Sequence, residues 1–270
     1  MERRTVLKAL AVGWSPVALL GRAGPAAADD TRLLVAAGDL NHRPDAIATG
    51  RRAVAHRPDL VATVGDQQYP DGSLEDYRAK YGTTPWAALK RITRPVPGHH
   101  EYDTPRATGY FAYFGVPSHY AYEIGAGWRG YALNSHVDVA EQAAWLRRDL
   151  ARHPGADVVA AWSDPLRSSG TKHGGDRRMQ AFWDALAGRR GTVLNGHEHH
   201  YERFARRDGL RQFVVGTGGS ATYPFGPPVA GSEVRIDHVP GILVLRLERG
   251  GGCRWRFEDT TGRTRDEGRD

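Results

Sequence analysis

The sequence has very little cysteine and no long apolar run, and both shortages restrict the kind of protein it can encode. Cys253 is the one cysteine among 270 residues, so no disulfide forms within the chain. A hydrophobic core must therefore hold the fold together, with bound metal as a further support. No stretch approaches the roughly 20 apolar residues of a membrane-spanning helix. A Walker phosphate loop and a Ser-His-Asp order are also missing, which weakens kinase-like and serine-hydrolase alternatives.

The first 28 residues have the composition of an export signal. Arg3 and Arg4 precede a modest apolar run near Ala9–Leu20, and a Pro-Ala-Ala-Ala segment ends the stretch. The surrounding RRTVLK is similar to a twin-arginine signal, which is read by a translocon that handles folded proteins. An ordinary secretory signal that contains two arginines is the alternative. Either one predicts an exported protein, located in the cell envelope or outside the cell.

The net charge gives no indication of a nucleic-acid partner. The formal charge of the whole chain is +6 at pH 7. Loss of residues 1–28 removes four basic residues and one acidic residue, which leaves +3 for the mature chain. A mild excess of this kind, spread along the chain, does not predict binding to nucleic acid. The sequence leaves the oligomeric state open.

Short apolar runs alternate with amphipathic stretches along the rest of the chain, a pattern typical of an α/β fold. We expect strands at residues 32–39, 59–66, 127–135, 156–164, 191–199, 210–219 and 241–248. We expect helices between the first two strands and at residues 140–153 and 177–188. The absence of a linker predicts one domain over residues 29–258, and residues 259–270 are expected to be a frayed tail.

Polar residues follow several of these expected strands. Asp39 and Asp66 each end an apolar run in a Gly-Asp pair. His197 and His199 stand two apart, so their side chains can face the same way from an extended segment. In open α/β sheets, ligands gather beyond the carboxyl ends of the strands. Each motif alone is weak, because Gly-Asp is also common in turns and helix caps.

The order of the motifs is more specific than any one of them. Gly-Asp, Gly-Asp-x-x-Tyr, Gly-x-His-Glu and Gly-His-x-His follow one another, together with PVPGHHEY, SSGTKHG and FVVGTGG. From about Leu33 to Gly219 the chain therefore resembles the calcineurin-like metallophosphoesterases. Tyr69 in GDQQY, with Asn41 where other branches have histidine, resembles the purple-acid-phosphatase branch. The resemblance implies a two-sheet β-sandwich flanked by helices, with a metal site at the strand C-terminal ends.

The resemblance also implies two metal ions and the side chains that hold them. Asp39, Tyr69 and His199 would bind the first metal, Asp66 would bridge both metals, and His197 would bind the second. These donors suit iron at the first site and iron, zinc or manganese at the second. The implied reaction is hydrolysis of a small phosphate monoester, or of a diester, by attack of a metal-activated hydroxide.

Further residues are expected around this centre. His100 would act as the catalytic residue that assists the leaving group or stabilises developing charge, and Glu101 would line the pocket with it. His173 is either a substrate contact or part of a solvated loop. Glu202 would steady a ligand histidine. We expect His136 to be an ordinary surface or hydrogen-bonded histidine.

Two positions depart from the family pattern, and both concern the second metal. His99 stands where the family has a ligand asparagine, and Ser163 stands where it has a ligand histidine, followed here by Asp164. His99 can compensate for the loss by binding the metal, or it can be a pocket histidine that binds nothing. Asp164 can add a carboxylate only if the strand is kinked, because neighbouring strand residues point to opposite faces.

Three alternatives for the whole protein follow from these departures. In the first, a small Ser163 makes room for His99, and the second site keeps Asp66, His99 and His197, which with waters make a workable open site. In the second, the protein holds one metal and turns over slowly or not at all. In the third, it is a catalytically weak or inactive, metal-stabilised binding protein on the same scaffold.

Overall fold

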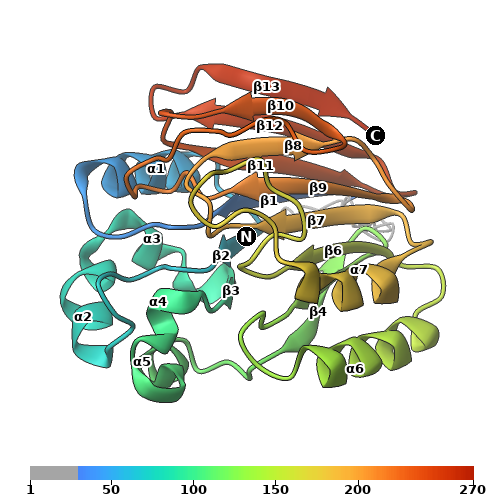
Figure 1. Cartoon of the computed structure of the whole chain (residues 1–270), viewed down its shortest axis with the longest axis horizontal. Coiled ribbons are helices and arrows are strands. Elements are labelled where there is room, and N and C mark those ends of the chain that lie inside the picture. Colours follow the sequence, from blue (N-terminus) through green and yellow to red (C-terminus); the bar gives the residue numbers. More distant parts are fainter. Residues whose placement is uncertain (1–29) are drawn as a thin grey trace, which may run out of the picture.

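Two mixed β-sheets face each other at the centre of the fold (Figure 1). The computed structural model describes residues 30–270, so the predicted export signal lies outside the described residues. The first sheet has the strand order β13-β12-β11-β1-β2-β3. Its strands are β1 (Thr31–Ala37), β2 (Leu60–Val64), β3 (Thr93–Val96), β11 (Gly241–Glu248), β12 (Cys253–Asp259) and β13 (Thr264–Arg269). Strands β1, β2 and β3 are parallel, and the others are antiparallel.

The second sheet has the strand order β10-β8-β9-β7-β6-β5-β4. Its strands are β4 (Tyr120–Gly125), β5 (Trp128–Ala132), β6 (Asp157–Ala161), β7 (Gly191–Asn195), β8 (Tyr201–Phe204), β9 (Leu210–Val215) and β10 (Ser232–Ile236). Its centre, formed by β5, β6, β7 and β9, is parallel. Parallel strands bring their carboxyl ends to one edge of a sheet, so the loops that follow them are neighbours.

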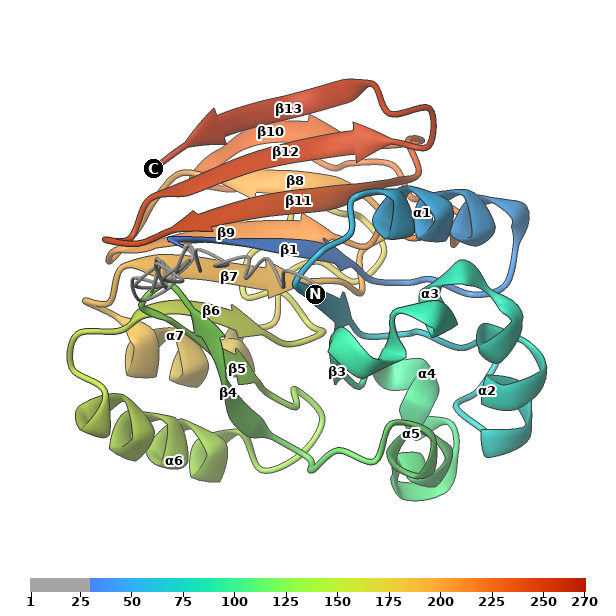
Figure 2. The same cartoon turned by 180° about the vertical axis from the view of Figure 1, so that it is seen from behind.

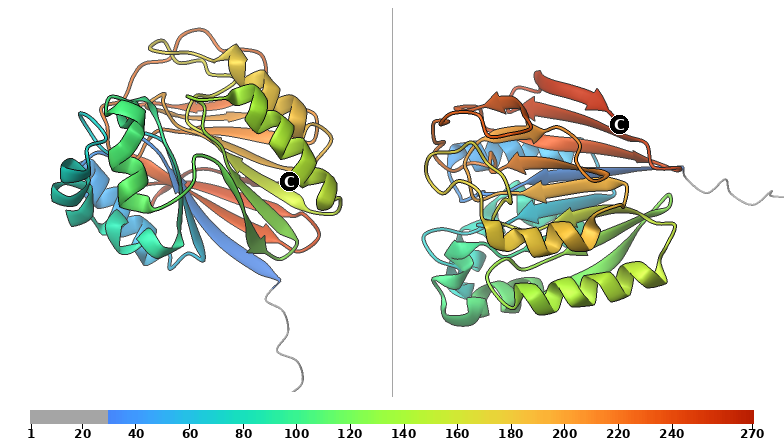
Figure 3. Two further views of the ribbon diagram at one scale, coloured as in Figure 1. Left: turned by 90° about the horizontal axis from the view of Figure 1, so that it is seen from below. Right: turned by 45° about the vertical axis from the view of Figure 1, so that its right-hand side comes forward.

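Helices cover the outer face of each sheet, so that the fold has four layers (Figures 2 and 3). The first sheet carries α1 (Pro44–Ala55), α2 (Leu74–Ala79), α3 (Pro85–Ala88), α4 (His99–Tyr102) and α5 (Thr108–Phe114), and the second carries α6 (Val139–Arg152) and α7 (Gln180–Leu186). Short 3-10 helices lie at Tyr81–Thr83, Lys90–Ile92, Pro105–Ala107 and Arg177–Met179. The predicted two-sheet sandwich flanked by helices is confirmed. Among the described residues, no helix is long and apolar enough to cross a membrane.

The sequence pattern explains this layering. Strands β2, β6 and β7 are buried along their whole length and read as continuous apolar runs, because sheet and helix cover their two faces. Strand β12 alternates instead, with Trp255 and Phe257 in the core between the sheets and Arg254 and Arg256 exposed on the other face. The alternating pattern of β12 therefore indicates, from the sequence alone, that helices cover the first sheet only in part.

The C-terminal residues correct one prediction. Strand β13 pairs with β12, with one register shift between Phe257 and Glu258, and the Asp266 side chain accepts hydrogen bonds from the Tyr201 hydroxyl and from Nε of Arg203, at 2.7 and 2.8 Å. The expected frayed tail over residues 259–270 is therefore wrong. The error has a clear cause: a polar edge strand carries no apolar run, so its sequence looks like that of a tail.

A buried carboxylate ties α6 to the second sheet and gives the fold a pH-dependent contact. Asp149 accepts hydrogen bonds from Nε of Arg129 (2.7 Å), from Arg152 (2.8 Å) and from the Tyr131 hydroxyl (3.1 Å). Burial alone would raise the pKa of Asp149, but these arginine partners outweigh it and bring the pKa down to about 2.

Replacing this carboxylate with Asp149→Asn should destabilise the fold by about 2 kcal/mol at pH 7. Because the folded pKa lies below the unfolded one, this stability is present above about pH 4 and is lost as the pH falls through about 2. Urea unfolding of both proteins between pH 7 and pH 2 measures the effect. A difference that stays constant over this range would show that ionisation of Asp149 contributes nothing.

Candidate metal centre

Five loops meet at one edge of the sandwich, and each follows the carboxyl end of a strand. They follow β1, β2, β3, β6 and β7, and backbone hydrogen bonds join them, such as Asp39 N–H to the Gly65 carbonyl and Gly196 N–H to the Ser163 carbonyl, both 3.0 Å. Asp39, Asp66 and His197 have positive φ angles of 57°, 49° and 70°. Such left-handed backbone is uncommon outside glycine and concentrates at functional sites.

The first group of donor atoms comes from Asp39, Tyr69 and His199. Oδ1 of Asp39 lies 3.1 Å from Nε2 of His199 and 3.2 Å from the Tyr69 hydroxyl, and the last two atoms are 3.4 Å apart. Nδ1 of His199 lies 2.5 Å from the Ala221 carbonyl, which can only accept, so Nε2 is the nitrogen left for a metal. A carboxylate, a phenol and an imidazole therefore converge, as predicted for the first metal site.

The second group of donor atoms comes from Asp66, His99 and His197. Nδ1 of His99 lies 2.9 Å from Oδ2 of Asp66 and 3.2 Å from Nδ1 of His197. The three side chains offer ligand atoms that all lie within 4.8 Å of one another, a spacing that can hold a metal ion. His99 therefore points into the centre, where its imidazole lies beside two other side chains that could bind a metal.

Residues beside Ser163 also face the second group of donor atoms. Oδ1 of Asp164 lies 3.4 Å from Nε2 of His197, and its Oδ2 lies 3.4 Å from Nε2 of His136. No kink is required, because β6 ends at Ala161 and strand alternation no longer applies at position 164. Ser163 is fully buried, and its hydroxyl has no hydrogen-bond partner. His136, which we expected at the surface or in a hydrogen bond, has a side chain that is 16% exposed and lies beside the centre against Asp164.

Glu101 supports the centre from behind and does not line the pocket as expected. It is completely buried and accepts hydrogen bonds from the backbone N–H groups of Asp66, Gln67 and Gly98 at 2.9, 3.0 and 2.7 Å. The Tyr77 hydroxyl adds a fourth at 2.9 Å. Burial, and then the charge of Asp66, raises the pKa of Glu101 to about 8, against the donors, which favour the charged form.

Two glutamates, one inside the His-x-His segment and one just after it, hold a loop in place. Glu198 accepts the N–H groups of His173 and Gly174 at 2.7 and 2.5 Å, and this role was not predicted. Glu202 contacts His200 at 3.5 Å and accepts the Ser169 N–H at 2.8 Å. The expectation that Glu202 steadies a ligand histidine is wrong, because His200 does not belong to either donor group.

His100 and His173 lie on opposite sides of the donor groups. The His100 ring is 4.2 Å from the rings of Tyr69 and His99, and the His173 ring is 4.0 Å from that of His197. A cavity of about 480 Å³ opens on the His173 side, with Lys172, Arg177 and Arg178 in its lining, and one of about 400 Å³ opens on the His100 side, with Arg43 and Lys80. Both entrances therefore carry positive charge.

The charges inside the centre are strongly linked. Burial alone would raise the pKa of Asp66, but the hydrogen bond and charge of His99 hold it well below the usual range. In return Asp66 raises the pKa of His99 to about 9, against burial. Burial and then the charge of His197 lower the pKa of His173 to about 4. The pocket thus favours a carboxylate at Asp66 and a neutral imidazole at His173.

The donor chemistry fits a pair of metal ions. Carboxylate and phenol oxygens at the first group suit a hard ion, and the imidazole-rich second group suits iron, zinc or manganese. The two groups are neighbours, since Oδ2 of Asp39 accepts the N–H of His197 at 2.9 Å. The residues present therefore fit the cofactor that the sequence resemblance implies, with His99 in the place of a lost ligand.

The fold is similar to that of solved phosphatase structures. No protein-family model and no curated protein matches the sequence. Solved structures, however, are similar to this chain in fold. Purple acid phosphatase PPD1 from yellow lupin (Lupinus luteus) has a TM-score of 0.74 at 17% identity, over 88% of this chain and 53% of the lupin chain. A dimetal phosphatase from Danio rerio has a TM-score of 0.61 at 12% identity, over 89% and 99% of the two chains.

A third similar structure has a different description. GAP50, the anchor in the inner membrane complex of Plasmodium, has a TM-score of 0.69 at 13% identity and matches over 88% of both chains. At such identities the likeness shows the fold and no more. The chain spans about half the length of the lupin phosphatase, so the remainder of that protein has no counterpart in the match.

Proposed function

We propose that this protein is an exported, metal-dependent phosphoesterase that hydrolyses a small phosphate monoester or diester. The observation that carries the proposal is the pair of adjacent donor groups at the carboxyl edge of the sheets, each with three converging ligand atoms. Bound there, two metal ions would supply the Lewis acidity that lowers the pKa of a water and stabilises charge on a phosphoryl group. The basic residues at both entrances would attract the phosphorylated substrate.

His100 is proposed to supply the proton that the leaving group needs. Its Nδ1 lies 2.6 Å from the Pro70 carbonyl, which can only accept, so Nδ1 carries a proton and Nε2 is left for the substrate. The N–H of His100 donates to Oδ1 of Asp66 at 2.9 Å, which fixes the residue against the centre. When the ring is doubly protonated, Nε2 also carries a proton, and that proton can pass to the oxygen of the leaving group as general acid.

A metal-stabilised binding protein is the second candidate. Ser163 favours it, because a neutral hydroxyl is a poor ligand where the related phosphatases have histidine. The Plasmodium anchor shows that a protein described by an anchoring role has this fold. On this view the centre would stabilise the fold, and the cavities would bind a phosphorylated molecule without cleaving it.

The double variant His99→Asn/Ser163→His separates the two candidates. If the native chain is an enzyme in which His99 compensates, it should turn over nitrophenyl phosphate, and the pair should change mainly the metal preference. If the native chain is inactive and the pair creates turnover, the binding protein is supported. Comparison of nitrophenyl with bis-nitrophenyl phosphate then distinguishes monoesterase from diesterase activity.

Iron loading gives a readout that does not depend on turnover. If Tyr69 binds ferric iron at the first site, its phenolate should give the loaded protein a purple colour with a visible absorption band. We expect Tyr69→Phe to lose this band while His100→Phe, at a neighbouring ring that is not a proposed ligand, keeps it. A band that survives in Tyr69→Phe would remove Tyr69 from the ligand set.

A further inference from the structure

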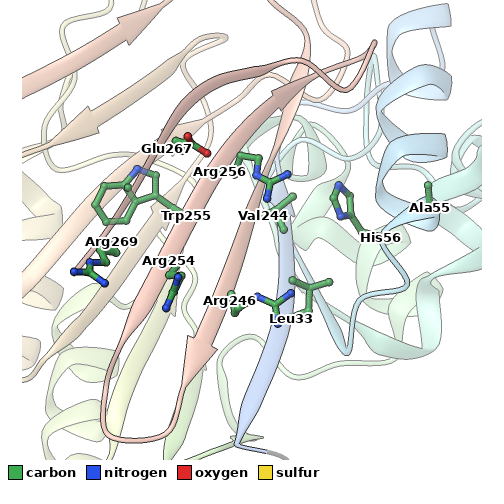
Figure 4. Close-up of a pocket in the computed structure, with 11 residues that line it drawn as sticks. Leu33, Ala55, His56, Val244, Arg246, Arg254, Trp255, Arg256, Glu267 and Arg269 are labelled. Carbon is green, nitrogen blue, oxygen red and sulfur yellow. The ribbon is translucent and has the colours of Figure 1, made fainter.

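A second basic groove is lined by residues of β1, β11, β12 and β13 and of the end of α1 (Figure 4). It has a volume of about 640 Å³ and runs over the outer face of the first sheet beside the end of α1. Its lining contains four arginines and a single glutamate, together with His56. The arginines are Arg246, Arg254, Arg256 and Arg269, which come from β11, β12 and β13.

Three of these arginines form one row across the sheet. Arg246 on β11 is the direct partner of Arg254 on β12, and Arg254 is the direct partner of Arg269 on β13. Directly paired residues on adjacent strands project from the same face, and like charges at such positions destabilise a sheet. All three side chains are exposed. The fold therefore holds a repulsive row of guanidinium groups that its own stability does not require.

Carboxylates neutralise this row only in part. Arg254 is paired with Glu248 at 2.8 Å. No ion pair involves Arg246 or Arg269 within the described range of residues 30–270. The groove thus keeps excess positive charge at its centre and at its outer end.

The neighbouring carboxylate is already shared. Arg256 lies 3.1 Å from Oε1 of Glu258, but Oε2 of the same carboxylate accepts hydrogen bonds from Arg52 at 2.7 Å and lies 2.9 Å from Nε2 of His56. The single carboxylate of Glu258 therefore contacts Arg52, His56 and Arg256, and its side chain is buried. Arg256 also stands directly opposite Glu267 on β13, so the uncompensated charge of the groove lies on Arg246 and Arg269.

We propose that this groove binds a linear chain of phosphate groups. Adjacent strands are about 4.8 Å apart, so the arginine row presents guanidinium groups in series over about 10 Å, a distance that a single phosphate does not cover. A guanidinium fork matches phosphate oxygens in a bidentate manner. An extended polyanion would relieve the repulsion along the row while it gains these contacts.

Other polyanionic partners fit less well. Single-stranded nucleic acid is bound largely by exposed aromatic rings on which bases stack, but Trp255, the aromatic residue of the lining, is only 6% exposed. A bilayer or a protein partner needs apolar anchors. The exposed large apolar side chains among the described residues are Val54 and Val229, and neither lines the groove.

The groove and the metal centre lie at different ends of the first sheet. Leu33, at the start of β1, lines the groove, whereas Asp39 follows the end of that strand at the centre. Binding in the groove would therefore hold the protein on a phosphate polymer without placing that polymer at the metal centre. The proposal does not depend on the proposed catalytic function.

Fluorescence anisotropy with labelled inorganic polyphosphate tests the proposal. The full-length chain is used with a chelator present, so that the metal centre does not bind or cleave the probe. We expect Arg246→Gln/Arg269→Gln to weaken binding at least about tenfold, since hydrogen bonds to charged groups are lost. The matched control Arg147→Gln/Arg148→Gln removes the same charge from exposed positions on α6 and should bind within about twofold of the native chain.

Each of the other outcomes either supports or overturns the polyphosphate proposal. Equal affinity of the groove and control variants would overturn the proposal, since binding would then follow net charge alone. Tighter arginine-dependent binding of single-stranded DNA or of phosphatidylserine vesicles than of polyphosphate would also overturn it. Arg246→Lys/Arg269→Lys should bind better than the glutamine pair, because charge is kept. The native protein and the groove variants, loaded with metal, should turn over nitrophenyl phosphate at the same rate. Failure of the polyphosphate proposal would therefore leave the proposed metal centre unaffected.

Discussion

Asp66→Asn should abolish binding of the second metal and reduce phosphoesterase turnover by about a thousandfold, which corresponds to about 4 kcal/mol of transition-state stabilisation. Asp66 is the carboxylate of the second donor group and the one that the resemblance assigns to both metals. Asparagine keeps the shape, tolerates the positive φ of 49°, and still accepts the N–H of His100. The substitution therefore removes the negative charge and leaves the loop intact.

Metal content by elemental analysis and nitrophenyl phosphate turnover on the same preparation provide the measurement. Asp184→Asn is the control, because this exposed carboxylate on α7 accepts only a hydrogen bond from Gln180 and lies away from the centre. The control should behave like the native chain. If Asp66→Asn kept native metal content and turnover, Asp66 would not be a ligand and the proposed centre would be misplaced.

Glu101→Ala should destabilise the metal-free protein by about 3 to 5 kcal/mol. The buried carboxylate is the acceptor for the N–H groups of Asp66, Gln67 and Gly98 and for the Tyr77 hydroxyl. Without it these donors remain buried and unpaired, and each such loss costs about 1 to 3 kcal/mol. Because the loops after β2 and β3 both depend on this residue, metal binding should weaken as well.

Urea unfolding in the presence of a chelator isolates the effect on the fold from that of bound metal. Glu101→Gln is the matched variant, since its amide keeps one acceptor oxygen but turns an NH2 group toward the donors, so it should fall between native and Glu101→Ala. A loss below about 1 kcal/mol for Glu101→Ala would show that water or a rearranged loop replaces the carboxylate.

The sequence predicted the parts of the fold that rest on local pattern. The apolar runs that become β1, β2, β6, β7, β9 and β11 are unambiguous, because they are buried on both faces or alternate clearly. The α1 and α6 helices follow from their apolar spacing. Strands β10 and β13 could not be found in this way, since polar strands at a sheet edge take their structure from their neighbours. Strands β8 and β12, which lie inside the sheets, were also missed.

The candidate centre, like the fold, could be predicted from the sequence only in part. Asp39, Asp66 and His197 were found because each follows a strand, and the convergence of strand ends places them together. His136 and Asp164 were missed or misjudged because they meet the centre through the loops after β5 and β6, where strand alternation no longer applies. The role of Glu101 was misjudged because a carboxylate beside two histidines looks like a pocket residue, while its partners lie in a different loop.

Counting metal atoms in the purified mature protein, together with nitrophenyl phosphate turnover on the same sample, tests the central claim most directly. The proposed function predicts two metal atoms per chain and measurable turnover, with His99 completing the second site. One metal or none, with no turnover after iron, zinc or manganese is supplied, would contradict it and leave a binding protein on a phosphoesterase fold.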